Sequence, residues 1–348
     1  MLGKLLDCFV TRLGTTVWLI AILVSACSSS KDASVPEGNR RIFRNRVQIE
    51  WQRSITSNDT LFAVPSMLAL SDSVIAVLDP SANRVVALSR TTGVPVWTFG
   101  ATGSGPGELR NPSAIIPSAN GSFVVFDPSN GKAIELSRFG RLVRERAVGG
   151  ATLVRSACYL SDGRLIVSQM DIGAPIVLLD SALRRVRALE FPWPTASVVI
   201  GQGQAQANIS EFVRTTQGVI GALGSNGCIF ARQTDAGIAL LNSSGVVWRT
   251  PGIDTPPLNS LRDNTSTAIA IGRTGDSLLV AYHGIGKRMG KLIDVYDTRS
   301  GKYEGSIETP DRISWMSVDA RGIAVLKNTE TGATISYWTL RNASTRPR

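Results

Sequence analysis

The sequence predicts an all-β fold, a six-bladed β-propeller in which each blade is a four-stranded antiparallel sheet. Two observations lead to this fold class. A short apolar run that follows a turn returns six times, at intervals of roughly 50 residues, which is typical of propeller blades. No 3.6-residue apolar pattern fills the intervals, so helical repeats are not expected. The six runs begin at Val74, Phe123, Leu165, Cys228, Leu278 and Ile323.

Each repeat continues with a second apolar strand, a short turn that contains Gly or Ser, and a more polar strand. In the first repeat these segments are SDSVIAVLD from Ser71, RVVALS from Arg84 and PVWTFG from Pro95. Strands separated by such turns are expected to pair as antiparallel hairpins. Together with the strand that precedes each turn, such as AIIPS from Ala114, each repeat supplies four strands.

The sixth repeat lacks its outer strand. It ends at Leu340 with a third strand, and only residues 341–348 follow, which we expect to form a disordered basic tail. The strand-like segment NRVQIEWQRSI, residues 45–55, is otherwise unassigned. We expect it to complete the sixth blade, because a ring closed by strands from both chain ends leaves no open edge. The propeller would then span residues 45–340.

The first 26 residues predict an export signal. Lys4 and Arg12 give a basic start, and residues 13–26 form an apolar run. That run is about 14 residues long, shorter than the roughly 20 that a membrane-spanning helix needs. A basic start followed by a short apolar run is typical of a secretory signal.

The end of this signal resembles a bacterial lipobox, in the segment Val24-Ser25-Ala26-Cys27. The resemblance implies that Cys27 carries acyl chains and anchors the protein in a membrane. Ser28 after the cysteine implies sorting to the outer membrane, with the protein facing the periplasm. The alternative is an ordinary signal peptide cut after Ala26. Residues 27–44 are expected to form a polar tether.

Charge and cysteine usage fit an exported protein. The net charge of +10 comes from scattered basic residues, which we interpret as a solvated surface. Nucleic acid is not an expected partner, because an exported protein seldom meets it. Cys158 and Cys228 lie in apolar strand-like runs without a CxxC spacing. An exported protein can pair them, but we favour two buried free thiols.

A family resemblance covers the first two repeats. FGATGSGPGELRNPSAI (99–115) and VVFDPSNGKAIELSRFG (124–140) resemble NHL repeats, with Asp79, Asn83, Asp127 and Asn130 carrying the signature. Later repeats keep only the spacing. The chain is similar in this respect to bacterial six-bladed propeller lipoproteins, and the resemblance implies a fold rather than a function.

Candidate catalytic features are few, and an enzyme is not the favoured interpretation. The glycines of residues 100–107 precede a strand rather than a helix, so they predict a structural turn and not a phosphate cradle. His283 is the only histidine, without a metal-ligand spacing around it. The alternative function is a calcium-dependent lactonase-like or phosphotriesterase-like hydrolase that uses the central channel, with Asp263 and Asp311 as carboxylates. A quinone-cofactor dehydrogenase is less favoured still, and no cofactor is expected.

Loop lengths favour a binding or scaffold function. The turns between first and second strands, and between third and fourth, are short and share one face. The long loops (100–111, 191–217, 251–267 and 283–290) share the other face, where loops on a rigid scaffold commonly bind partners. The alternative is that these loops only cap the channel. A monomer that engages a protein or cell-envelope polymer is expected, through Trp193, Arg214, Arg262, His283, Lys287 and Arg288.

Overall fold

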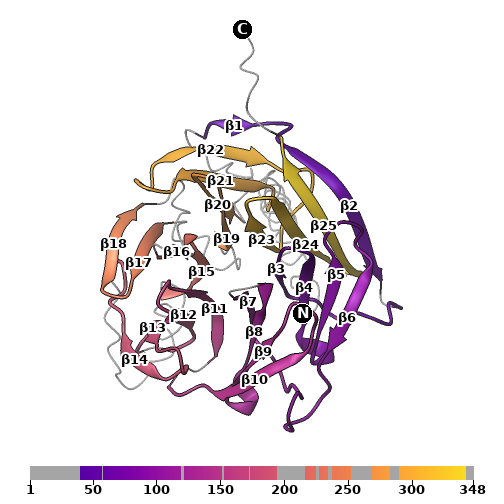
Figure 1. The fold of residues 1–348 in the computed structure, drawn as a ribbon. Coiled ribbons are helices and arrows are strands. Elements are labelled where there is room, and N and C mark those ends of the chain that lie inside the picture. The colour runs from indigo at the N-terminus through magenta and orange to yellow at the C-terminus, as the bar shows by residue number, and fades with distance from the viewer. Residues whose placement is uncertain are drawn as a thin grey trace, which may run out of the picture. The chain divides into compact units, whose positions relative to one another are not determined.

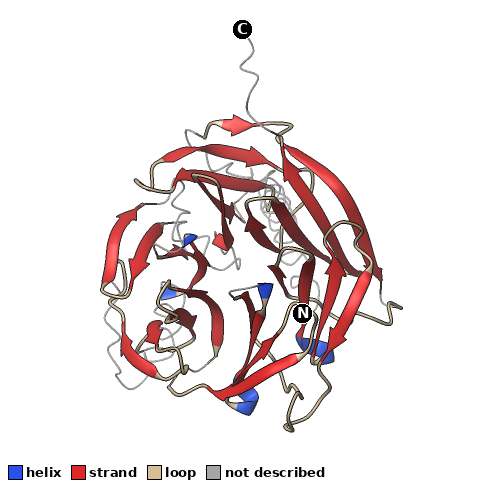
Figure 2. Cartoon of the chain, viewed as in Figure 1, coloured by secondary structure: helices blue, strands red, loops and turns tan. Residues whose placement is uncertain are grey.

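The computed structural model describes residues 40–56, 58–118, 121–150, 153–171, 173–193, 216–224, 227–233, 237–251, 268–282 and 290–341. The chain divides into two compact units, Met1–Glu37 and Gly38–Arg348, and all described residues belong to the second. Strands dominate this unit, with short helical turns such as Pro80–Ala82 and Pro128–Asn130. Figure 1 shows six sheets around a central axis, and Figure 2 shows the same strands in red. The predicted all-β, six-bladed propeller is confirmed.

The blades follow one another in chain order, and each begins at the centre of the ring. Blade 1 contains β3 (Met67–Leu70), β4 (Val74–Asp79), β5 (Arg84–Ser89) and β6 (Pro95–Phe99). Blade 2 contains β7 (Ala114–Pro117), β8 (Phe123–Asp127), β9 (Lys132–Leu136) and β10 (Leu142–Ala147). Blade 3 contains β11 (Val154–Tyr159), β12 (Leu165–Gln169), β13 (Ile176–Leu179) and β14 (Arg185–Ala188).

The remaining blades keep this pattern and include strands from the start of the chain. Blade 4 contains β15 (Gly218–Ala222), β16 (Cys228–Arg232), β17 (Ile238–Asn242) and β18 (Gly245–Thr250). Blade 5 contains β19 (Ala268–Thr274), β20 (Ser277–Tyr282), β21 (Leu292–Asp297), β22 (Tyr303–Glu308) and β1 (Ile42–Phe43). Blade 6 contains β23 (Trp315–Asp319), β24 (Gly322–Thr329), β25 (Gly332–Leu340) and β2 (Val47–Thr56).

The N-terminal strand closes the ring as the sequence predicts. Strand β2 pairs antiparallel with β25 over its whole length, from Val47 opposite Leu340 to Thr56 opposite Gly332. The last blade is therefore built from both ends of the described chain (Figure 1). Because β2 is paired with β25, the ring cannot open without breaking this ladder.

The fold begins earlier than the boundary expected at residue 45. Strand β1 pairs in parallel with β22, with Ile42 opposite Ser306. Arg40 forms an ion pair with Asp294 in which the two side chains are 2% and 0% exposed, and its guanidinium lies 4.4 Å from the centre of the Tyr282 ring. Residues 40–44, which the sequence assigns to the tether, thus belong to the propeller. A two-residue strand next to buried charge has no apolar pattern that would reveal it.

The core lies between blades, and it explains why the central strands are apolar throughout. Six apolar clusters among the described residues occupy the six interfaces between neighbouring blades. Alternate residues of one strand face opposite neighbours: Ile75 and Val77 pack towards blade 6, whereas Val74, Ala76 and Leu78 pack towards blade 2. Every residue of β4 is consequently buried. A strand buried on both faces reads as a continuous apolar run.

A repeated bulge shapes the outer edge of each blade. In all six blades the pairing between third and outer strands shifts by one residue. In blades 6, 1 and 4 the residue after the bulge is a tryptophan that packs against a glycine in the outer turn of the next blade. These glycines have φ near +70°, and an added Cβ would lie 2.5–2.7 Å from the indole ring. The pairs are Trp51 with Gly93, Trp97 with Gly140 and Trp248 with Gly301.

The expectation of free thiols is wrong, because Cys158 and Cys228 form a disulfide. Cys158 is on β11 and Cys228 is on β16, so the bond joins blade 3 to blade 4 across their shared core. Their Cα atoms are 6.0 Å apart, which is within the usual range for a disulfide. The residues are 70 positions apart in the sequence, and only the stacking of neighbouring blades brings them together.

Candidate functional site

Most of the predicted binding residues lie outside the described residues. This is true of Arg214, Arg262, His283, Lys287 and Arg288, and also of the proposed acylation site Cys27. Trp193 is described and half-buried. Its ring lies 6.0 Å from that of Phe191 and 6.1 Å from that of Phe230, against the core between blades 3 and 4. Part of the indole also lines an outer groove together with Trp248 and Arg249.

The strand bounds agree with the predicted difference between the two faces. Turns between first and second strands and between third and outer strands define the short-turn face, and none is longer than the five residues of 118–122 or 160–164. The longer connections between described strands, including 100–113, 189–217 and 283–291, define the long-loop face. Successive connections of an antiparallel sheet alternate between its ends, so this division follows from topology.

The glycine-rich loop and the signature acids are structural. The carboxylate of Asp79 accepts hydrogen bonds from the backbone N–H groups of Ala63 (2.5 Å) and Val64 (3.1 Å). The equivalent Asp127 accepts from the Arg110 N–H at 2.7 Å, and Asn130 donates to the carbonyl of Gly103 at 2.9 Å. Each acid therefore fixes the link that enters its own blade. Strand β7 follows the glycine-rich loop, in agreement with the predicted structural turn.

The carboxylates suggested for a calcium site do not form one in the described part of the chain. Asp311 pairs with Lys327 at 2.7 Å, and Asp263 lies outside the described residues. No group of three or more His, Cys, Asp or Glu side chains is placed to hold a metal ion among the residues described. Within the same residues, no helix is long and apolar enough to cross a bilayer.

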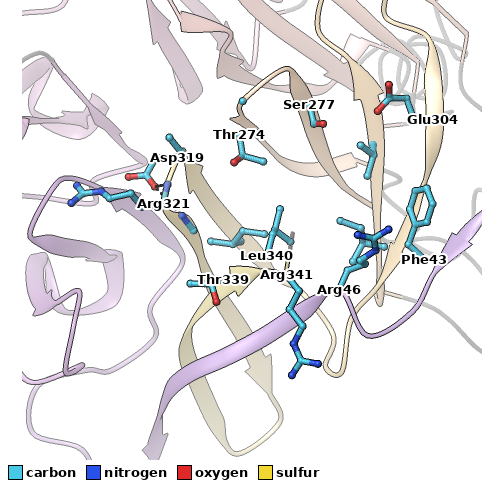
Figure 3. A pocket seen from close by; sticks show the side chains of 16 residues that line it. Phe43, Arg46, Thr274, Ser277, Glu304, Asp319, Arg321, Thr339, Leu340 and Arg341 are labelled. Carbon is cyan, nitrogen blue, oxygen red and sulfur yellow. Dashed lines mark hydrogen bonds between the residues drawn. The ribbon is translucent and has the colours of Figure 1, made fainter. Parts of the chain in front are cut away.

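A cavity of about 610 Å³ lies at the short-turn end of the junction between blades 5 and 6, and we call it the closure cavity (Figure 3). The turns β19–β20 and β23–β24 and the ends of β25 and β22 surround it. Its apolar lining comprises Phe43, Val295, Ile307, Ile323 and Leu340. Its polar lining includes Thr274, Ser277, Thr339, Glu304, Arg46 and Arg341.

The closure cavity lies at a junction that lacks a side-chain contact found between most other neighbouring blades. At other junctions a tryptophan, or an arginine such as Arg187, reaches from an outer strand to the outer turn of the next blade. Blade 5 has Gly305 at that position, and an added Cβ there would clash with Phe43. Blade 6 offers no outer turn to receive a side chain, because its third and outer strands come from opposite chain ends. Ring closure thus leaves this space unfilled.

Three charged side chains of the closure cavity, those of Arg46, Glu304 and Arg341, lack ion pairs in the part of the chain that the structure describes. The Arg46 guanidinium lies 5.5 Å from the centre of the Phe43 ring, and Figure 3 shows the two side by side on one wall. Glu304 is exposed on the same side. The Arg341 side chain extends away from the cavity in this view. Arg46 and Glu304 are therefore the charges that a ligand would meet.

The other charged residues of the closure cavity already have partners. Asp319 accepts hydrogen bonds from Arg90 at 2.5 and 2.6 Å. Burial acts to raise the pKa of Asp319, but the hydrogen bonds from Arg90 and from the Arg321 N–H lower it below its ordinary value. Asp319 is therefore ionised at neutral pH and cannot serve as a proton donor. Arg321 forms an ion pair with Asp72. Sequence reasoning missed Phe43, because residues 40–44 look like a polar linker, and it placed Arg46 in the closing strand without assigning it to a site.

Comparisons with solved structures support the fold. One similar chain, described as an exported protein of Bacteroides fragilis NCTC 9343, is 14% identical with a TM-score of 0.55, and the alignment covers 86% of this chain and 99% of that one. A streptogramin B lyase is 15% identical with a TM-score of 0.51, covering 84% and 88% of the two chains. Virginiamycin B lyase from Staphylococcus aureus is 13% identical with a TM-score of 0.51, covering 85% and 100%. At these identities the likeness shows the propeller fold alone.

The chain matches no protein-family model and none of the curated proteins.

Proposed function

We propose that this chain is a non-enzymatic binding or scaffold protein of the bacterial cell envelope. In this proposal it is anchored at the outer membrane through Cys27, faces the periplasm and engages a protein or cell-envelope polymer through its long-loop face. The Cys158–Cys228 disulfide supports export, because disulfides persist in oxidising compartments. The uneven distribution of long connections supports the choice of face.

Within the described residues, the closure cavity offers a second and separate binding site, at the short-turn end of the junction between blades 5 and 6. It combines an apolar lining with a half-buried cation, Arg46, that has no carboxylate partner there. Concave, mostly apolar pockets with a few polar groups are the usual form of small-molecule sites. The ligand class that fits is an organic anion with an apolar body, in which the apolar part covers Val295 and Leu340 and the anionic group meets Arg46.

We expect the probe 8-anilinonaphthalene-1-sulfonate, an apolar anion, to bind the folded protein saturably at one site, measured by its fluorescence. Arg46→Ala should weaken this binding by roughly tenfold, because a hydrogen bond to a charged group contributes about 1.5–3 kcal/mol. Arg44→Ala is the matched control, since Arg44 is 71% exposed and pairs with Glu308 outside the cavity. Equal affinities of the two variants, with both folded by circular dichroism, would contradict the assignment.

A further inference from the structure

The outer hairpin of blade 2 carries an unusual exposed segment, which we call the arginine hairpin (residues 138–144). It links β9 to β10 and reads Arg-Phe-Gly-Arg-Leu-Val-Arg. Every residue except Gly140 is exposed. Phe139 is 64% exposed, Val143 54% and Leu142 41%. Large apolar side chains that stay in contact with water at one spot mark an interaction surface.

The hairpin is fixed in a way that projects Phe139 outward. The Trp97 indole of blade 1 packs against Gly140, and its Nε1–H donates to the carbonyl of Arg138 at 3.0 Å. A side chain at position 140 would meet that ring, and the φ of +73° also favours glycine there. The Trp97 contact therefore fixes the turn, and the Phe139 side chain stays exposed. The corresponding outer turns of blades 1, 3, 4 and 5 contain no aromatic residue.

The arginine hairpin is strongly cationic. Neither Arg138 nor Arg141 forms an ion pair in the part of the chain that the structure describes, and the Arg138 guanidinium lies 4.7 Å from the centre of the Phe139 ring. The nearby carboxylates are already neutralised. Glu135 pairs with Arg144 at 2.7 Å and with Arg146 at 3.5 Å, and Glu145 pairs with Lys132 at 3.2 Å.

The position of the arginine hairpin in blade 2 fixes the face on which it lies. It is a turn between third and outer strands, so it belongs to the short-turn face. The proposal therefore concerns the short-turn face, on which the arginine hairpin projects.

We propose that the short-turn face of the propeller docks on an anionic phospholipid surface through the arginine hairpin. Phe139 and Leu142 enter the headgroup region, and Arg138 and Arg141 contact lipid phosphates. Basic residues interleaved with Phe and Leu are typical of interfacial membrane binding. A single convex turn is too narrow to bury the roughly 800 Å² per partner of a standard protein interface, whereas a fluid bilayer can surround it. This orientation leaves the long-loop face directed away from the membrane.

The test is flotation of the full chain carrying Cys27→Ser, which removes the proposed acylation, with vesicles of phosphatidylcholine alone or mixed with phosphatidylglycerol. We expect at least tenfold preferential binding to the anionic vesicles, declining as salt is raised. Phe139→Ser/Arg141→Ser in the same chain should reduce that preference by more than fivefold, since one basic residue near an anionic surface contributes about fivefold. Arg299→Ser, in the outer turn of blade 5, is the control and should change it by less than twofold.

Equal binding of the hairpin variant and the parent to anionic vesicles would overturn the proposal, as would equal binding of the parent to both vesicle types. The substituted side chains are exposed, so thermal unfolding of the variant should match that of the parent. A negative result in the vesicle test can be distinguished from failure of the proposed function. The hairpin variant leaves the closure cavity unchanged, so probe binding there is tested independently.

Discussion

Replacing Arg90 with alanine is expected to lower the free energy of unfolding by about 2 kcal/mol, because a hydrogen bond to a charged group contributes about 1.5–3 kcal/mol and Asp319 is 32% exposed. Arg90 follows β5 in blade 1, and its side chain is 6% exposed. Its guanidinium donates hydrogen bonds to both carboxylate oxygens of Asp319 in blade 6 and to the Tyr337 hydroxyl, the latter at 2.8 Å. Trp51 of the closing strand donates to the Arg90 carbonyl at 2.7 Å. One residue thus ties the first blade to the last.

The matched control is Arg164→Ala. Arg164 also pairs with an aspartate, Asp162, at 2.5 Å, but within an exposed turn of blade 3. Water screens an exposed ion pair, which therefore contributes little to stability, so this variant should unfold almost as the parent does. Urea unfolding of parent and both variants measures the difference. Similar losses for Arg90→Ala and Arg164→Ala would show that the contact between first and last blades does not hold the ring.

The Arg90–Asp319 pair also predicts how the stability of the protein changes at acidic pH. Burial acts to raise the pKa of Asp319, and the Arg90 hydrogen bonds outweigh it, so the folded pKa lies below the unfolded one. Such a group contributes its full stabilisation above its unfolded pKa of about 3.9 and loses it as the pH falls through the folded value. The stability difference between parent and Arg90→Ala should therefore shrink as the pH is lowered below about 4.

Removing the disulfide by Cys158→Ala/Cys228→Ala is expected to cost about 4 kcal/mol. The bond closes a loop of 70 residues, and the loss of unfolded-chain entropy grows slowly with loop length, from about 3 kcal/mol for 15 residues to about 4.7 for 100. Both side chains are buried between blades 3 and 4, so part of the cost is lost packing.

Measuring unfolding with and without a reductant separates the contribution of the disulfide bond from that of the lost side-chain packing. The free energy of unfolding of the parent should fall when the disulfide is reduced, whereas that of the double variant should not change with the reductant. A parent whose unfolding is unaffected by reductant, with reduction verified by thiol titration, would show that the bond is absent or without effect on stability.

The fold could be predicted from sequence because each blade buries both faces. That arrangement produces apolar runs such as β4 and β8, and turns between them at a regular spacing. The closing strand β2 could also be predicted, since the last repeat lacked an outer strand. Strand β1 and the buried Arg40–Asp294 pair could not, because a two-residue strand has no periodicity and a buried charge resembles a surface charge in sequence.

The closure cavity could not be predicted for a different reason. It depends on the absence of a side chain at Gly305 and on the absence of an outer turn in blade 6, and both become visible only when neighbouring blades are stacked. The disulfide depends on the same stacking. The signature residues Asp79 and Asp127 were recognisable from the repeat, but only the structure shows that they hold the links entering their blades. The proposed long-loop residues other than Trp193 stay a prediction.

The most direct test of the binding role is capture of a partner from cell-envelope extract by the full-length protein. Three baits are compared: the parent, a variant lacking residues 195–210 of the long-loop face, and Arg299→Ser on the short-turn face. Charge reversal by Arg214→Glu/Lys287→Glu serves as a second long-loop variant in case the deletion does not fold. We predict that the parent and Arg299→Ser enrich the same protein or polymer, and that both long-loop variants lose it while they unfold at the parent's temperature. Identical captured material from all folded baits would contradict recognition through the long-loop face.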